Sequence, residues 1–153
     1  MSKFTISNAK YDSQGSRTSF YIVGRGRGFK TFDTKQDAEI ARSYQVILSY
    51  HDFAPKVYSE VGRIVIGGKL SNWGYITQKV KTLGCNDPCD DCGCNRCERD
   101  LYKYEDDMMC MSEYIEENCG FRIGDLHMGN FGIMKGKLVV IDTGMESFNG
   151  AFA

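Results

Sequence analysis

The segment FGIMKGKLVVID, residues 131 to 142, constrains the fold more than any other part of the chain. Two apolar runs, FGIM and KLVVID, flank Lys135-Gly136-Lys137, which is the signature of a β-hairpin. A hairpin brings the residue before its first strand next to the residue after its second strand. We therefore expect Asn130 to lie beside Asp142.

Glycine-rich GDLHMGN, residues 124 to 130, precedes this hairpin and contains Asp125, His127 and Asn130. Phosphoryl transfer from a nucleotide requires a carboxylate that orients the acceptor hydroxyl, and oxygen ligands for Mg²⁺. Asp125, Asn130 and Asp142 supply both. The simpler interpretation is a turn rich in Asp and Asn between a helix and a hairpin.

These residues carry a resemblance. GDLHMGN followed by FGIMKGKLVVIDTG resembles the catalytic loop and metal-binding segment of the protein-kinase-like superfamily, in particular of aminoglycoside phosphotransferases and related small kinases. The resemblance implies that Asp125 is the catalytic base and that Asn130 and Asp142 hold Mg²⁺. It also implies that His127 braces the loop.

The first 80 residues are predicted to form a small, mostly antiparallel sheet with one helix packed on it. FTISNA and SFYIVG are expected strands joined by DSQGSR, FKTF is a third, and a helix capped by Thr34 follows. The resemblance implies that Lys30 of FKTF contacts the phosphates of ATP and pairs with Glu39 of the helix. It further implies nucleotide contacts at Gly15 in DSQGSR and at the backbone near Ile76 and Gln78.

The expected fold is therefore α+β, a minimal two-lobed protein-kinase-like fold. Residues 1–79 would form the antiparallel-sheet N-lobe, and residues 80–153 a reduced helical C-lobe with the catalytic and metal loops at 124–144. Apolar residues at spacings of three and four predict one helix in that C-lobe, with the stripe Leu101, Tyr104, Met108, Met111 and Ile115. Only nine residues follow Gly144, so we expect no further helical region.

Five of the seven cysteines fall within residues 85–97. The run CDDCG has the form of a zinc knuckle, so we expect one structural Zn²⁺ held by four of the cluster's members, Cys85, Cys89, Cys92, Cys94 and Cys97. Disulfides, free thiols and an iron–sulfur cluster are the alternatives.

Charge is unevenly distributed, although the net charge is only −1. Residues 1–84 carry 13 basic and 6 acidic side chains, whereas residues 85–117 carry 3 and 11. Acidic surroundings of the cysteines argue against a nucleic-acid partner. No apolar run is long enough to cross a membrane, and the N-terminus has no signal-peptide pattern, so the cytoplasm is the expected location.

The function expected from the sequence is an ATP- and Mg²⁺-dependent kinase that also binds Zn²⁺. Its partners would be the nucleotide and an acceptor, either a protein or a small molecule, and a dimer is compatible with the sequence. The alternative is an inactive kinase-fold module that binds a nucleotide or a protein without turnover.

Overall fold

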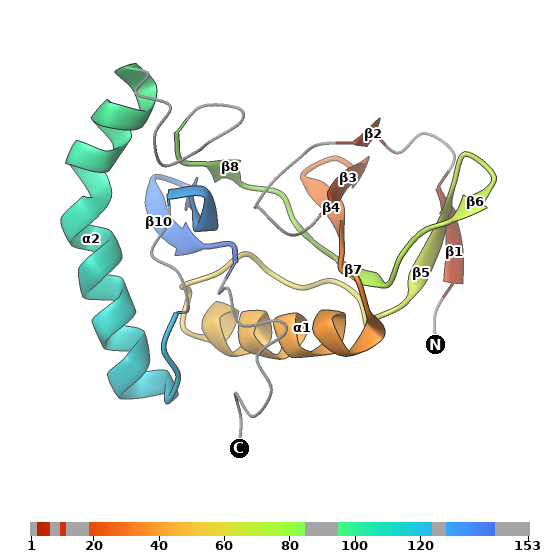
Figure 1. The fold of residues 1–153 in the computed structure, drawn as a ribbon, viewed down its shortest axis with the longest axis horizontal. Helices are drawn as coiled ribbons and strands as arrows, with labels where there is room; N and C mark the ends of the chain where they lie inside the picture. The colour runs from red at the N-terminus through yellow and green to blue at the C-terminus, as the bar shows by residue number, and fades with distance from the viewer. Residues whose placement is uncertain (1–2, 7–9, 12–18, 85–94, 124–127, 143–153) are drawn as a thin grey trace.

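The computed structural model describes residues 3–6, 10–11, 19–84, 95–123 and 128–142, which form an α+β structure (Figure 1). Within these residues lie two α-helices and three small sheets, and all strand pairs except one are antiparallel. The predicted α+β class is confirmed. No helix in this described part is long and apolar enough to cross a bilayer.

The largest sheet has the strand order β2-β3-β4-β7. Its members are β2 (Lys10–Tyr11), β3 (Ser19–Gly24), β4 (Arg27–Thr31) and β7 (Gly74–Gln78). The predicted strands SFYIVG, FKTF and WGYITQKV correspond to β3, β4 and β7. Because β4 is paired on both edges, its residues from Gly28 to Thr31 are buried.

Helix α1 (Lys35–Tyr50) follows β4 directly. The predicted cap is confirmed, since Thr34 Oγ1 accepts a hydrogen bond from the Asp37 N–H at 3.0 Å. One face of the helix is buried against the rest of the protein, and it consists of Ala38, Ala41, Tyr44, Gln45 and Leu48. His51 ends the helix, where a break was expected.

The first strand pairs differently from the prediction. β1 (Lys3–Ile6) runs parallel to β5 (Arg63–Ile66), and β6 (Lys69–Leu70) completes this separate sheet. Residues 3–6 therefore pair with β5 and not with SFYIVG, and the short β2 pairs with β3 instead. Residues 3–6 and 63–66 are far apart in the sequence, so no short turn between them could have predicted their pairing.

The third sheet contains the predicted hairpin. β9 (Phe131–Met134) and β10 (Lys137–Val140) pair in antiparallel register, and β8 (Lys81–Thr82) extends the sheet beyond β9. Lys135 and Gly136 form a two-residue turn with φ values of 53° and 76°. Positive φ at both turn positions is the type I′ geometry that matches the twist of a hairpin.

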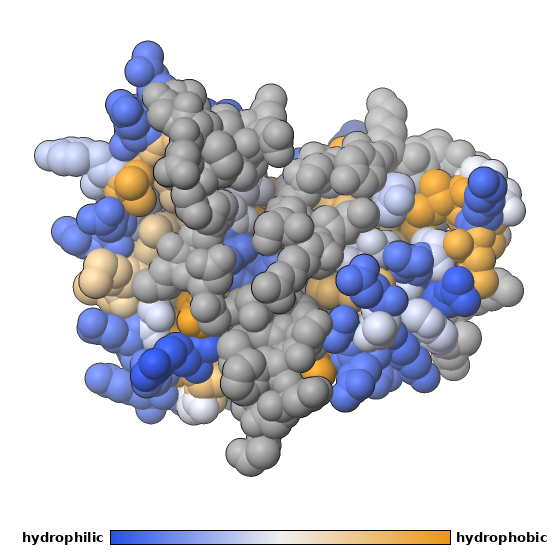
Figure 2. Space-filling view, viewed as in Figure 1, coloured by the Kyte–Doolittle hydropathy of each residue, from blue (hydrophilic) through white to orange (hydrophobic). Residues whose placement is uncertain are grey.

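Helix α2 (Asn95–Cys119) begins earlier than the expected apolar stripe. Met108 and Ile115 are buried as predicted, but Leu101 is 39% exposed. Gly120, with φ of 81°, follows the last helical residue, in the C′ place expected for glycine. Figure 2 shows hydrophilic residues over α2, and its exposed side chains include Glu105, Asp106, Asp107, Glu113, Glu116 and Glu117.

Two clusters of buried apolar side chains hold these elements together. The smaller one joins α1 to β4 and β7 through Phe32, Ala38, Ala41, Val61 and Tyr75. The larger one joins the C-terminal half of α1 to α2 and to the hairpin, and includes Tyr44, Leu48, Met108, Ile115, Phe131 and Val140. Helix α1 thus contributes to both, and the larger core contains residues from both sides of the predicted boundary at residues 79 and 80.

Candidate functional site

Two of the predicted site residues, Lys30 and Asp142, line one pocket, and a third, Asn130, is hydrogen-bonded to Asp142 through the backbone. Lys30 is on β4, Asn130 ends the 3₁₀ turn η1 (Met128–Asn130), and Asp142 follows β10. They are only 7%, 4% and 5% exposed, respectively. Burying polar groups costs free energy unless they are satisfied, so three such residues at one place suggest a site rather than a surface turn.

The hairpin positions Asn130 beside Asp142. The Asn130 carbonyl accepts hydrogen bonds from the Ile141 N–H at 2.8 Å and the Asp142 N–H at 3.3 Å. The expected proximity of Asn130 and Asp142 is confirmed. Side-chain amide and carboxylate oxygens are groups that Mg²⁺ accepts as ligands, so this pair could hold the ion.

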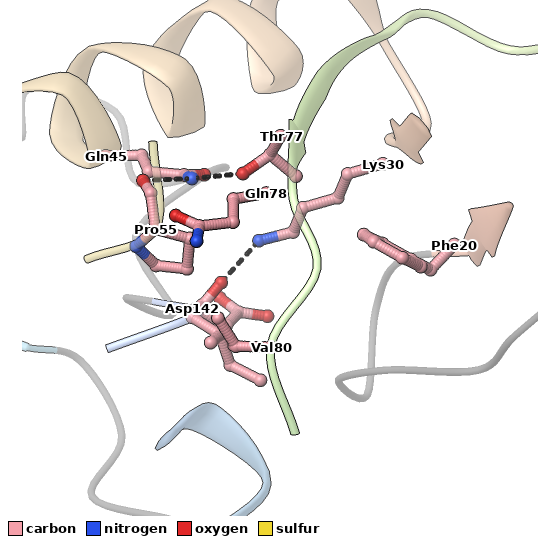
Figure 3. Close-up of a pocket in the computed structure, with 9 residues that line it drawn as sticks. Phe20, Lys30, Gln45, Pro55, Thr77, Gln78, Val80 and Asp142 are labelled. Carbon is pink, nitrogen blue, oxygen red and sulfur yellow. Dashed lines mark hydrogen bonds between the residues drawn. The ribbon is translucent and has the colours of Figure 1, made fainter. Parts of the chain in front are cut away.

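Lys30 approaches the same place from the sheet. Its Nζ donates a hydrogen bond to the Ile141 carbonyl at 2.6 Å and lies 5.5 Å from the centre of the Phe32 ring. Figure 3 shows the Lys30 amine pointing toward the segment that carries Asp142. The ammonium group therefore reaches the residue that precedes the predicted metal ligand.

The pocket is lined by one positive and one negative side chain, Lys30 and Asp142, together with neutral polar and apolar residues. Its lining consists of Phe20, Lys30, Gln45, Pro55, Thr77, Gln78, Val80, Ile141 and Asp142. A second cavity shares Lys30, Gln45, Ile141 and Asp142 with it and extends toward Leu48 and Val140. The pocket volume is about 20 Å³, which is room for a water molecule. A nucleotide would fit only if the walls moved apart.

A buried hydrogen-bond network forms one wall. Gln45 Nε2 donates to the Pro55 carbonyl at 2.9 Å and to Thr77 Oγ1, and the Tyr75 hydroxyl donates to Gln45 Oε1 at 2.7 Å. Thr77 Oγ1 in turn donates to the Lys56 carbonyl at 3.0 Å. Sequence reasoning missed Gln45. Its spacing from Ala38, Ala41 and Leu48 was the available signal, because it places an amide on the buried face of α1.

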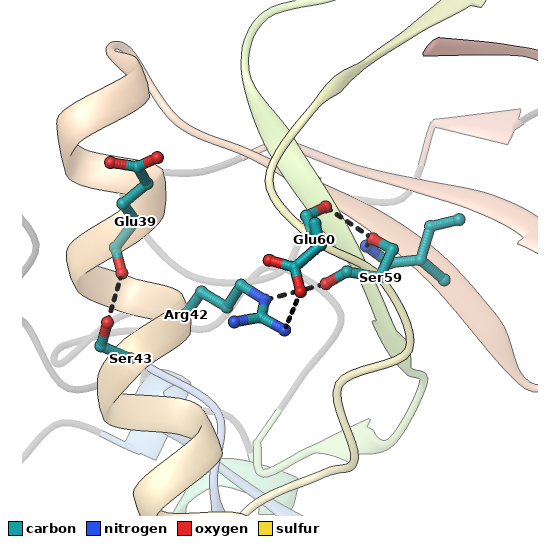
Figure 4. A network of polar contacts seen from close by, with 6 residues as sticks. Glu39, Arg42, Ser43, Ser59 and Glu60 are labelled. Atoms are coloured by element: carbon teal, nitrogen blue, oxygen red, sulfur yellow. Dashed lines mark hydrogen bonds and ion pairs between the residues drawn. The ribbon is translucent and has the colours of Figure 1, made fainter. Parts of the chain in front are cut away.

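The structure does not bring Glu39 to Lys30. Glu39 is exposed, and its backbone carbonyl accepts a hydrogen bond from Ser43 Oγ at 2.9 Å (Figure 4). The reason is helical phase: at 100° per residue, Glu39 lies on the side of α1 opposite the buried face. Ala41, Gln45 and Leu48 are the helix residues that share a cavity with Lys30. The expected Lys30–Glu39 ion pair is therefore absent.

The ion pair that α1 does form involves Arg42. Arg42 Nε donates to the Ser59 carbonyl at 2.9 Å, and Arg42 Nη2 lies 3.5 Å from Glu60 Oε1 (Figure 4). Both charged side chains retain solvent contact, so the pair fastens α1 to the segment before β5 only weakly.

The predicted adenine contacts fall on backbone that is already hydrogen-bonded. The Ile76 N–H donates to Ser59 Oγ at 2.8 Å, and the Ile76 carbonyl accepts from the Tyr58 N–H at 2.8 Å. The N–H groups of Gln78 and Lys79 donate to the carbonyls of Lys56 and Gly26. Ile76 therefore faces the segment 56–59 and not the pocket, whereas the Gln78 side chain lines the pocket.

Several predicted residues lie outside the described residues. They are Gly15, Asp125, His127, Cys85, Cys89, Cys92 and Cys94. Of the cysteine cluster only Cys97 is described, and it is buried in the first turn of α2. The described residues contain no group of three or more side chains arranged to hold a metal ion.

The pKa shifts resolved in the described residues lie on α2 and just after it. Burial raises the pKa of the Cys119 thiol. A hydrogen-bonded ion pair lowers the pKa of the exposed Glu116 and raises that of Arg122, with Arg122 Nη2 at 2.9 Å from Glu116 Oε1. None of these groups lines the pocket.

Comparisons with protein-family models, with the sequences of characterised proteins and with solved structures gave no match to this chain.

Proposed function

We propose that this chain is an ATP- and Mg²⁺-dependent phosphotransferase of minimal size, with a two-lobed kinase-like fold. The observation that carries the proposal is that Lys30 meets Ile141 and Asp142 at one pocket, although Lys30 and Ile141 are 111 residues apart in the sequence. A cation, an amide and a carboxylate at one place are what phosphoryl transfer uses for positioning and charge neutralisation.

Each residue has a role in this proposal. ATP with Mg²⁺ supplies the transferable phosphoryl group. The Lys30 ammonium exchanges the Ile141 carbonyl for phosphate oxygens, which are stronger acceptors because they are charged. Asn130 and Asp142 offer oxygen ligands to the metal ion. Asp125, which lies outside the described residues, orients the acceptor hydroxyl and accepts its proton.

A second candidate is a kinase-fold module that binds a nucleotide or a protein without turnover. Two observations favour it. Glu39 is exposed and makes no ion pair with Lys30, and the pocket has room only for water while Lys30 is bonded to the Ile141 carbonyl.

One pair of measurements distinguishes the two. Calorimetry with ATP and Mg²⁺ tests binding, and incubation with γ-³²P-ATP and candidate acceptors tests transfer. For an enzyme, Asp125→Asn lowers the transfer rate by roughly 10² to 10⁴, while Asp142→Asn weakens ATP binding. Asp106→Asn, an exposed change of the same kind on α2, is the control. ATP binding without transfer supports the module, and the absence of both overturns the kinase-like proposal.

We also propose one structural zinc ion, held by four of the five cysteines Cys85, Cys89, Cys92, Cys94 and Cys97. Zinc sites of this type contribute folding free energy, on the order of 10 kcal/mol. Elemental analysis is expected to find about one zinc per chain and to find less in Cys92→Ser, because Cys89 and Cys92 form the predicted knuckle. Cys110→Ser changes an exposed cysteine of α2 and serves as the control. Metal-free protein with disulfides in the cluster contradicts the proposal.

A further inference from the structure

A second cavity lies between α2 and the third sheet, away from the Lys30 pocket. Figure 1 shows β8 close to the N-terminal end of α2. The cavity volume is about 230 Å³, and the lining residues come from β8, β9 and the first three turns of α2: Lys81, Thr82, Leu83, Arg96, Arg99, Asp100, Tyr104 and Ile133. It shares no lining residue with the Lys30 pocket.

The charge of this cavity is positive. Three basic side chains and one carboxylate line it. Asp100 Oδ2 accepts a hydrogen bond from the Gly84 N–H at 2.8 Å and lies 4.0 Å from Arg96 Nε. Among the described residues, no ion pair engages Lys81 or Arg99. Counted over the described residues, the cavity therefore has two positive charges without an ion-pair partner.

The remaining walls provide an apolar surface and a hydroxyl without a partner. Leu83, Ile133 and Tyr104 are buried or partly buried. Thr82 Oγ1 is shielded from solvent and has no hydrogen-bond partner, so a ligand would reach this hydroxyl only if the wall shifted.

We propose that this cavity binds a small phosphomonoester. A dianionic phosphate matches the two uncompensated charges, because cationic side chains hold phosphate oxygens through charge-assisted hydrogen bonds. The volume is below the roughly 300–1,000 Å³ of sites for drug-sized ligands, so the ligand is compact. Its organic part contacts Leu83, Ile133 and the Tyr104 ring. This proposal does not depend on the kinase-like function.

The test is calorimetric titration of the full chain with glycerol 3-phosphate, inorganic phosphate and glycerol. We expect saturable binding of glycerol 3-phosphate, weaker binding of inorganic phosphate, and none of glycerol. Lys81→Gln and Arg99→Gln should each lower the affinity for glycerol 3-phosphate roughly tenfold or more. Both side chains are exposed, so these variants should fold normally, and thermal melts verify this.

Two controls separate this cavity from other sites. Lys69→Gln removes a charge from an exposed residue of β6 that does not line the cavity, and Lys30→Gln removes the cation of the other pocket. Both should bind the ester as wild type does. The proposal is overturned if glycerol 3-phosphate shows no saturable binding, or if it binds no more tightly than inorganic phosphate. It is also overturned if Arg99→Gln keeps the wild-type affinity for the ester, or if Lys30→Gln is the variant that loses binding.

Discussion

Adding a single methyl group at Gly74, by Gly74→Ala, should lower the thermal stability of the protein strongly. Gly74 lies in β7 opposite Thr31 of β4. A Cβ atom added there would lie 2.9 Å from the Lys30 carbonyl carbon and much closer to the carbonyl oxygen, whereas real Cβ atoms essentially never approach another atom within 3.0 Å. The atoms that it meets belong to the backbone, so no side chain can rotate away. Gly74→Ala must therefore move β4, and Lys30 with it.

Overpacking of this kind costs about 1–3 kcal/mol and occasionally more. We take about 3 kcal/mol, since the obstructing atoms are backbone in a strand that is paired on both edges. For a chain of this length, about 2–4 °C of melting temperature is lost per kcal/mol, so Gly74→Ala should melt about 6–12 °C below wild type.

The matched control is Gly24→Ala, the same chemical change in β3 of the same sheet. Gly24 is exposed, and an added Cβ has nothing within 4 Å. Replacing such a glycine is neutral or stabilises by about 0.4–1 kcal/mol, because the unfolded chain loses conformational freedom. Circular dichroism melts of both variants provide the measurement. Equal melting temperatures would refute the packing of β7 against the Lys30 backbone.

Three further predictions concern α1 and α2. Gln45→Leu breaks the network to Pro55, Thr77 and Tyr75 and leaves buried polar groups unsatisfied, so urea denaturation should show a loss of about 1–3 kcal/mol that the exposed control Gln36→Leu does not show. Glu39→Gln should change stability by no more than about 0.5 kcal/mol, as expected for an exposed site, and should leave any Lys30-dependent ATP binding unchanged. A tenfold loss of that binding would mean that Lys30 and Glu39 do pair. Because burial raises the pKa of Cys119, less of it is thiolate in mildly alkaline solution, and mass spectrometry should find it alkylated more slowly than the exposed Cys110. Equal rates would contradict the burial of Cys119.

The features predicted correctly from the sequence are those with local causes. Lys135-Gly136 specifies a two-residue turn, and the turn alone places Asn130 beside Asp142. Thr34 and Asp37 specify the start of α1, and Gly120 marks the end of α2. In each case the residues that determine the geometry lie within a few positions of one another.

The features that were missed depend on contacts between distant segments. No short turn connects β1 and β5, so their parallel pairing could not be predicted from local sequence. The hydrogen bonds of Ile76 depend on where the segment 56–59 lies against β7. The Glu39 prediction was wrong for another reason: order along the chain suggested a partner for Lys30, while the buried face of α1, readable from Ala38, Ala41 and Leu48, pointed to Gln45.

Gln45 in place of a carboxylate changes the electrostatics around Lys30. Nothing on the buried face of α1 carries a negative charge, and Lys30 donates a hydrogen bond to the neutral Ile141 carbonyl. A buried ammonium is less favourable beside neutral acceptors than beside an anion. In the proposed function, the Lys30 ammonium leaves the neutral Ile141 carbonyl and binds phosphate oxygens. This exchange breaks no ion pair between Lys30 and α1.

The same argument predicts that Gln45→Glu, by giving Lys30 a competing anion, should weaken ATP binding rather than strengthen it. Calorimetry on Gln45→Glu beside Gln36→Glu measures this, and tighter binding in Gln45→Glu would show that a helix carboxylate assists Lys30.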